Sequence, residues 1–89
     1  MPVNYEKVSE KFKALAHPAR LRIVVGLLKD ECNVAQIQKV LRLPQSTISQ
    51  HLKILKNAGI IKGRKEGTKT CYKVIDTRIR RIVEIIKRK

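Results

Sequence analysis

Acidic residues are scarce in this chain of 89 residues, in which seven Asp and Glu stand against 21 Lys and Arg, for a net charge of +14. So strong a positive field on a small body favours a polyanionic partner, nucleic acid first and an anionic membrane surface second. Long apolar runs are also missing. The longest one near the N-terminus, Ile23–Leu28, has six residues and contains a glycine, so it is too short to span a bilayer.

Cysteine occurs only at Cys32 and Cys71, which is too few for a disulfide framework and suits a reducing compartment. The N-terminal residues contain no apolar signal core, so a cytoplasmic location is expected. The length allows one domain, residues 1–89, whose small core would gain stability from pairing with a second copy. No nucleophile stands at a usable spacing from a base, and no phosphate-binding loop is present. We therefore expect neither an enzyme nor a bound cofactor.

Apolar residues at helical spacing predict four helices before residue 60. Such spacing over Tyr5–Leu15 indicates the first helix, which Pro18 ends near residue 17. Pro18 suits the first turn of a second helix, and Asn33 is a good N-cap for a short third one. Pro44 begins a fourth helix, which Gly59 closes as a left-handed cap. The inward positions expected on helices two to four are Leu21, Val24, Val25, Leu28, Val34, Ile37, Val40, Leu41, Ile48, Leu52 and Leu55.

The pattern changes after residue 59. Ile60–Lys65 and Thr70–Ile75 read as strands joined at the tip Glu66–Lys69, with one or two further strand residues at Cys32. Asp76 can cap a last helix. These elements predict a mainly α fold with a small β-wing, a winged helix-turn-helix of four helices, two strands and a final helix. The apolar stripe of the last helix comprises Ile79, Ile82, Val83 and Ile86.

The outward face of the fourth helix is polar and lacks acids, as a recognition helix in the major groove requires. Gln can pair with an adenine edge, Ser and Thr can bond to bases or phosphates, and an acid would be repelled by the DNA backbone. The positive end of the helix also favours a phosphate near Ser46. The plainer interpretation is an ordinary solvated helix face. The candidate DNA contacts on this helix are Gln45, Ser46, Thr47, Ser49, Gln50, His51 and Lys53.

The hairpin Lys62–Thr70 is predominantly basic. Such a loop can lie along the phosphate backbone or reach into the minor groove. Lysines on a hairpin also discourage pairing of the exposed strand edge with another chain. The basic hairpin therefore supports DNA binding only in combination with the predicted recognition helix. The candidate DNA contacts on the hairpin are Arg64, Lys65, Thr68 and Lys69.

The stretches FKALAHPARLRIVVGLL and NVAQIQKVLRLPQSTISQHLKILKNAGIIKGRKEGTKTCYKV lie between Phe12 and Asp76. Over this region the chain resembles the ArsR-type (ArsR/SmtB-like) winged helix-turn-helix repressors, and QSTISQHLKILKNAGII is specific for the family's recognition helix. The resemblance implies a homodimer, held by its first and last helices, on a pseudo-palindromic operator in double-stranded DNA. Half-sites would lie about one turn, ~34 Å, apart. The expected dimer residues are Tyr5, Val8, Phe12, Ile79, Ile82, Val83 and Ile86.

Metal sensing is known in this family, but its ligand patterns do not fit here. One pattern uses cysteines two apart at the start of the third helix, where this chain has Asn33 and Ala35, with Cys32 one residue off. Another uses Asp and His on the last helix, where Asp76 is followed by neither His nor Cys. A transition-metal site needs three or four ligands in fixed geometry, so no metal is expected.

The two cysteines form a candidate redox pair. In the expected fold Cys32 lies beside the second wing strand, so its sulfur could form a reversible disulfide with that of Cys71. The commoner alternative is two small buried side chains, and Cα atoms more than ~7 Å apart would exclude the bond. For His17 we expect capping or packing. His51 is expected to be partly buried, within reach of a phosphate.

Three alternatives remain at the level of sequence. A non-specific architectural DNA-binding protein would also need a large positive charge, and it would bind without regard to sequence. A winged helix can also serve as an interaction module for protein or RNA. The last helix could lie on an anionic membrane, but the matching apolar stripe of the first helix favours dimerisation.

Overall fold

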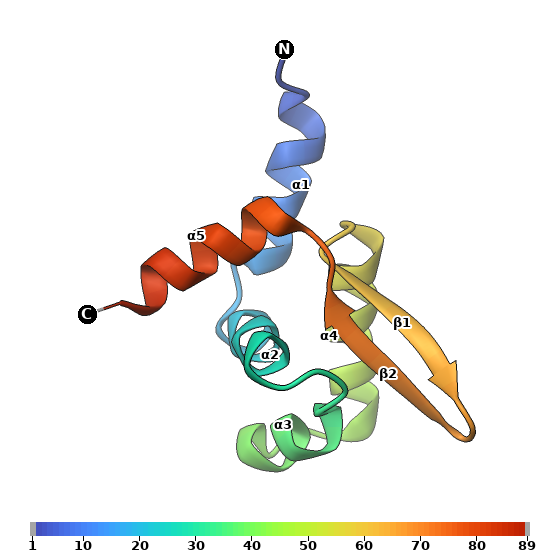
Figure 1. Ribbon diagram of the computed structural model, residues 1–89. Coiled ribbons are helices and arrows are strands. Elements are labelled where there is room, and N and C mark those ends of the chain that lie inside the picture. The colour runs from blue at the N-terminus through green and yellow to red at the C-terminus, as the bar shows by residue number, and fades with distance from the viewer. Residues whose placement is uncertain (1, 89) are drawn as a thin grey trace.

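The structure, a computed structural model, describes residues 2–88 of the chain. It contains five helices and one antiparallel hairpin in the order expected from the sequence (Figure 1). The elements are α1 (Tyr5–Leu15), α2 (Pro18–Lys29), α3 (Val34–Leu41), α4 (Gln45–Asn57), β1 (Ile61–Glu66), β2 (Lys69–Val74) and α5 (Thr77–Lys87).

Helix ends coincide with local capping signals. The His17 ring accepts a hydrogen bond from the Ala19 N–H at 3.1 Å, so it caps α2, as expected, just before Pro18. Asp76 caps α5 by accepting from two backbone N–H groups. Gly59 follows α4 with a φ of +76°, a left-handed conformation that costs glycine little. Asn33 stands at the start of α3, but its side chain makes no capping bond, contrary to expectation.

The core lies where α2 and α4 meet α1, the base of the hairpin and the start of α5. Its most buried large side chains include Ile23, Leu27, Ile48 and Leu55. The predicted inward face of α4 is confirmed, because Ile48, Leu52 and Leu55 are all buried. On α2 the most buried face is shifted toward Ile23 and Leu27, because α1, α3, α4 and β2 surround this helix over a wide arc.

Val40 was expected to face inward but is 66% exposed. The short helix α3 contacts α2 mainly through the buried Ile37 and the half-buried Val34 and Leu41. No element of residues 2–88 covers the outer side of α3, so the turn that carries Val40 stays open to solvent. The prediction for this residue was therefore wrong.

The hairpin pairs Ile61 with Val74 at its base and Glu66 with Lys69 at its tip, around a two-residue turn in which Gly67 has a φ of +65°. Its base is buried and its distal half is exposed. Instead of the short strand expected at Cys32, one backbone hydrogen bond joins the Cys32 N–H to the Tyr72 carbonyl at 3.1 Å. This bond ties the α2–α3 loop to β2.

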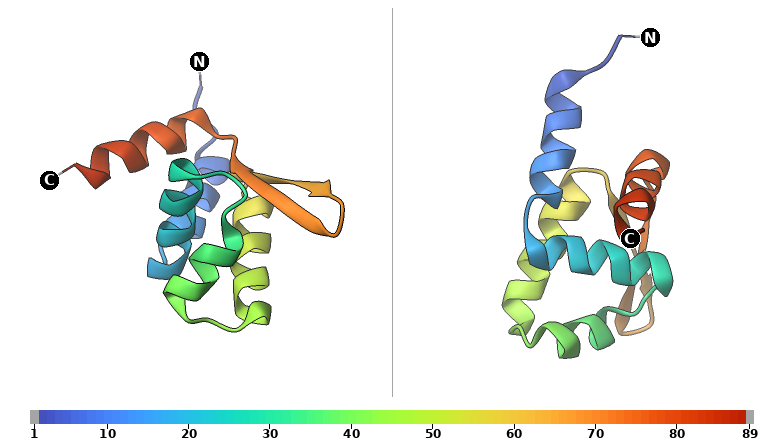
Figure 2. Two further views of the ribbon diagram at one scale, coloured as in Figure 1. Left: turned by 60° about the horizontal axis from the view of Figure 1, so that its bottom comes forward. Right: turned by 90° about the vertical axis from the view of Figure 1, so that its left-hand side faces the viewer.

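Figures 1 and 2 show the hairpin and α5 extending in opposite directions from the group formed by α2, α3 and α4. The N-terminal part of α1 also rises away from that group. An ion pair between Lys11 and Asp76 links α1 to the first residue before α5. Among the described residues, no helix combines the length and the apolar character needed to cross a membrane.

Candidate nucleic-acid interface

Helix α4 presents a polar, acid-free face that we call the α4 face, and its inward stripe is rooted in the core. The turn before it is set by Arg42, which ends α3 with a φ of +56°, and by the Gln38 side chain, which donates to the Leu43 carbonyl at 3.4 Å. Thr47 is half-buried beside this face. The exposed members of the α4 face are Gln45, Ser46, Ser49, Gln50 and Lys53.

His51 does not belong to the α4 face. It stands three residues after Ile48 and four before Leu55, so the helical period turns it inward, and it is only 9% exposed. Its ring packs against that of His17, with centroids 4.7 Å apart. The expectation that it reaches a phosphate is therefore corrected.

The environment of His51 favours its neutral form. Burial first, and then the nearby His17 and Arg20, lower the pKa of His51 below its usual value. Its Nδ1 atom is buried and has no hydrogen-bond partner among the described residues. A charge on this ring would be poorly solvated, so His51 acts as a core residue of α4 at neutral pH.

The four candidate contacts on the hairpin are all exposed. Arg64 donates a hydrogen bond to the Glu66 carboxylate at 2.7 Å, so part of its charge is already compensated. Lys65 points to the opposite side of β1 because strand residues alternate. The cations near the tip that form no ion pair with another described residue are therefore Lys65 and Lys69.

Cys32 and Cys71 are joined by a disulfide bond, and their Cα atoms are 4.3 Å apart. The pair thus meets the distance requirement set out above. The bond connects the exposed Cys32, in the α2–α3 loop, to the buried Cys71 on β2. It therefore fastens the loop to the base of the wing.

The carboxylate of Glu66 lies next to this pair, and one ligand atom from each of Cys32, Glu66 and Cys71 fits within 4.8 Å of the others. Sequence reasoning found the two cysteines but missed Glu66. The hairpin register could have indicated it, because Arg64 pairs with Cys71 and Glu66 lies two residues along the same face. Spacing along the chain could not reveal this group, because its members come from three segments that meet only in the folded chain.

An apolar patch runs from α1 to α5. Val8 and Phe12 of α1 share a small hollow of about 80 Å³ with Ile79 and Ile82 of α5. Ile79 and Val83, which we had assigned to a dimer interface, are 3% and 2% exposed and belong to the protomer's own core. The apolar side chains that stay exposed on these two helices are Tyr5, Phe12, Ile85 and Ile86.

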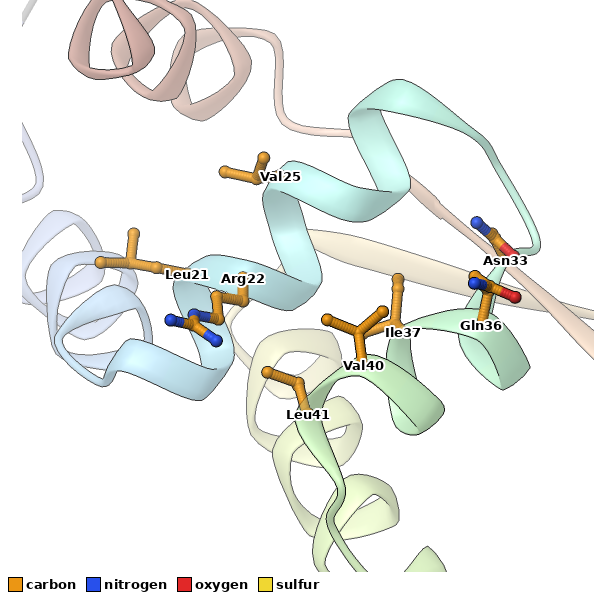
Figure 3. Close-up of a pocket in the computed structure, with 8 residues that line it drawn as sticks. All are labelled: Leu21, Arg22, Val25, Asn33, Gln36, Ile37, Val40 and Leu41. Carbon is orange, nitrogen blue, oxygen red and sulfur yellow. The ribbon is translucent and has the colours of Figure 1, made fainter.

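A groove of about 430 Å³ separates α2 from α3 (Figure 3). Val40 and Val25 line it with other apolar side chains, and Arg22, Asn33 and Gln36 supply its polar atoms. The sequence did not predict this groove, because it exists only through the packing of one helix on the other. It lies on different side chains from the α4 face.

Known proteins share both the sequence and the fold. A helix-turn-helix transcriptional regulator of Methanocaldococcus jannaschii is 46% identical over 84 residues, which cover 93% of this chain and 94% of the relative. The structure of HlyU from Vibrio cholerae, named a transcriptional activator, is 34% identical with a TM-score of 0.86 and covers 97% of this chain and 94% of its own. The structure of the repressor PagR of Bacillus anthracis is 36% identical with a TM-score of 0.81 and covers 93% and 95%.

The sequence profile of the bacterial regulatory proteins of the arsR family matches residues 17–62, from the residue before α2 through α4 into β1. The fold is a winged helix-turn-helix, as the sequence predicted. Members of this family regulate transcription and are not enzymes. The chain therefore belongs to the ArsR family of DNA-binding transcriptional regulators.

Proposed function

We propose that the chain works as a homodimer that recognises a pseudo-palindromic operator and represses transcription by excluding polymerase. The observation that carries this proposal is the α4 face, five exposed polar side chains without an acid, on a helix held by four buried residues. Rigid anchoring matters because base readout requires donors and acceptors at fixed positions. The name of PagR as a repressor favours repression, while that of HlyU makes activation the alternative outcome.

In this proposal α4 enters the major groove, and the wing follows the adjacent backbone. Gln45, Ser49 and Gln50 contact base edges, and Ser46, Thr47 and Lys53 contact phosphates or the groove wall. On the wing, Lys65, Thr68 and Lys69 contact the backbone. Arg64 contributes less, because Glu66 already accepts from it.

The apolar patch of α1 and α5 supplies the dimer contact in this proposal. Its exposed members are 49% to 77% accessible in the single chain, and a second copy would cover them while adding to a small core. The proposed interface differs from the one expected from the sequence, because Ile79 and Val83 are buried in the protomer and Ile85 is exposed. It consists of Tyr5, Val8, Phe12, Ile82, Ile85 and Ile86.

Selection from random duplex DNA tests the proposal. At about 150 mM salt, which suppresses non-specific phosphate binding, the recovered sequences should contain an inverted repeat with half-sites ~34 Å apart. Tight binding without a motif, together with a steep loss of affinity as salt rises, would instead identify an architectural DNA-binding protein. If the chain does not bind duplex DNA, the proposal is wrong, and the remaining alternative is that the winged helix is an interaction module for protein or RNA.

The Cys32–Cys71 bond favours a second proposal, that thiol redox state sets the position of the wing. A small-molecule dithiol would deliver two electrons and two protons to the bond and leave as its own disulfide. Without the sulfur–sulfur bond, the loop would be held to β2 by the Cys32–Tyr72 backbone hydrogen bond. This looser link should change operator affinity several-fold, and the Cys32→Ser chain should bind equally under both conditions. Equal affinity of the oxidised and reduced wild-type chains would contradict this proposal.

A further inference from the structure

We propose that, after reduction of the Cys32–Cys71 bond, Cys32, Cys71 and Glu66 form a binding site for a thiophilic divalent cation such as Zn²⁺ or Cd²⁺. The three ligand atoms lie within 4.8 Å of one another although they come from the α2–α3 loop, the end of β1 and β2. Within residues 2–88 this is the one group of three such side chains. Its position differs from Asn33, Ala35 and the last helix, where the family's ligand patterns would fall.

The backbone, and not only the sulfur–sulfur bond, holds these side chains together. The Cys32 N–H donates to the Tyr72 carbonyl at 3.1 Å, beside Cys71. Antiparallel pairing of Arg64 with Cys71 sets Glu66 on the same face of the hairpin. Neither constraint uses the sulfur–sulfur bond, so in this proposal the two thiols and the carboxylate remain neighbours when the disulfide is open.

The donor set matches a borderline-soft cation. Zinc takes four tetrahedral ligands with Zn–S bonds of ~2.3 Å, which places two bound sulfur atoms about 3.7 Å apart. The two sulfur atoms, bonded to each other in the oxidised chain, would have to separate to that distance after reduction. Three protein ligands leave one position for water or for Glu31, which lines a cavity of about 190 Å³ with Cys71. Two sulfur ligands disfavour Mg²⁺ and Ca²⁺, which prefer oxygen.

The charges around the group also suit a bound ion. Two thiolates and one carboxylate carry three negative charges, so a divalent cation leaves one. Lys62 and Lys73 line the adjoining cavity and can compensate that remaining charge, together with Arg64, which already donates to the Glu66 carboxylate. Each thiol releases its proton to solvent as its sulfur binds the ion. The bound ion then replaces the disulfide as the link between the α2–α3 loop and the wing.

The test uses the full chain in the absence of DNA, so failure of the DNA-binding proposal would not affect it. The disulfide is reduced with a dithiol, which becomes a cyclic disulfide and is removed under nitrogen, because excess dithiol would itself bind metal. Titration with Cd²⁺ should give the ultraviolet thiolate-to-cadmium charge-transfer absorption at one ion per chain. The oxidised chain should give none. A reduced chain without this absorption would overturn the inference.

Variants identify the ligands. Cys32→Ser and Cys71→Ser should each remove most of the absorption, and Cys32 is exposed, so its replacement should leave the fold intact by circular dichroism. Glu66→Gln should weaken binding by at least the roughly 10- to 100-fold that loss of an outer-shell partner costs. Glu84→Gln, an exposed carboxylate on α5, is the matched control and should bind as the wild type does. Full affinity in the cysteine variants or in Glu66→Gln would contradict the assigned ligands.

Discussion

At the scale of single residues, Gln50 separates base readout from phosphate contact. It is exposed in the second turn of α4, and no other described side chain forms a hydrogen bond with it that would hold it away from DNA. Replacement by Ala should cost about 1–3 kcal/mol of discrimination at one base pair and relax the preference there. The measurement is the Kd for the operator and for single-base variants of it.

Lys65→Ala tests for a phosphate contact, as Gln50→Ala tests for base readout. Lys65 is exposed near the hairpin tip and makes no ion pair with the described residues. If it contacts a phosphate, its loss should weaken all sequences about equally and reduce the slope of log K against log salt by about 1. A sequence-dependent effect for Lys65, or a uniform one for Gln50, would reverse the assigned roles.

His51 predicts a pH dependence of stability. Its pKa in the folded chain lies below the usual value, so the unfolded chain binds the proton more readily. The free energy of unfolding should therefore fall as pH drops through the unfolded pKa of ~6.5, and it should recover above that pH. Urea unfolding between pH 5 and pH 7.5 measures this, and His51→Phe should flatten that part of the curve. An unchanged slope in the variant would show that another group titrates.

At the scale of elements, Asp76 connects α1 to α5. It accepts hydrogen bonds from the N–H groups of Arg78 and Ile79 at 3.0 and 3.1 Å, and it pairs with Lys11. Asp76→Ala should destabilise the fold by about 0.5–2 kcal/mol from the lost cap alone. Asp76→Asn keeps a capping oxygen and removes the charge, so thermal unfolding of the two variants separates the cap from the ion pair.

The same carboxylate titrates in a different pH range from His51. Burial alone would raise the pKa of Asp76, but hydrogen bonds from Lys11, Ile79 and Arg78 together hold this pKa below its usual value. Its contribution to stability is present above the unfolded pKa of ~3.9 and is lost as pH falls further. Asp76→Asn should therefore change the acid limb of the stability curve, below about pH 4, and leave the region near pH 6 alone.

At the scale of the whole molecule, the apolar patch predicts how two copies associate. Ile86 is 67% exposed in the single chain, so Ile86→Glu should spare the protomer fold and shift sedimentation from dimer to monomer. Loss of the second half-site contact should lower operator affinity by about 10²-fold or more. Val40→Glu is the matched control, because Val40 is 66% exposed on α3, outside the patch. Dissociation by Val40→Glu, or a dimeric Ile86→Glu chain, would contradict this interface.

Much of the molecule follows from signals that are local in the sequence. Pro18, Gly59 and Asp76 mark helix ends through backbone geometry and short-range hydrogen bonds, so the order of elements could be predicted without knowing what packs on them. The polar face of α4 could be predicted in the same way. Its exposed members occupy the helical positions that face away from the buried stripe of Ile48, Leu52 and Leu55.

Only the tertiary structure decided which side chains each element covers. His51 is buried because α2 and its His17 lie against α4, and the stripe of α5 divides into a core part and an exposed end because the helix leaves the body after its first turns. The group of Cys32, Glu66 and Cys71 exists only because three segments meet at the base of the wing. Sequence by itself determined the elements, since caps and periodicity act over a few residues, and its similarity to the arsR family over residues 17–62 determined the family. Burial and ligand clusters depend on neighbours distant along the chain, so packing alone decided them.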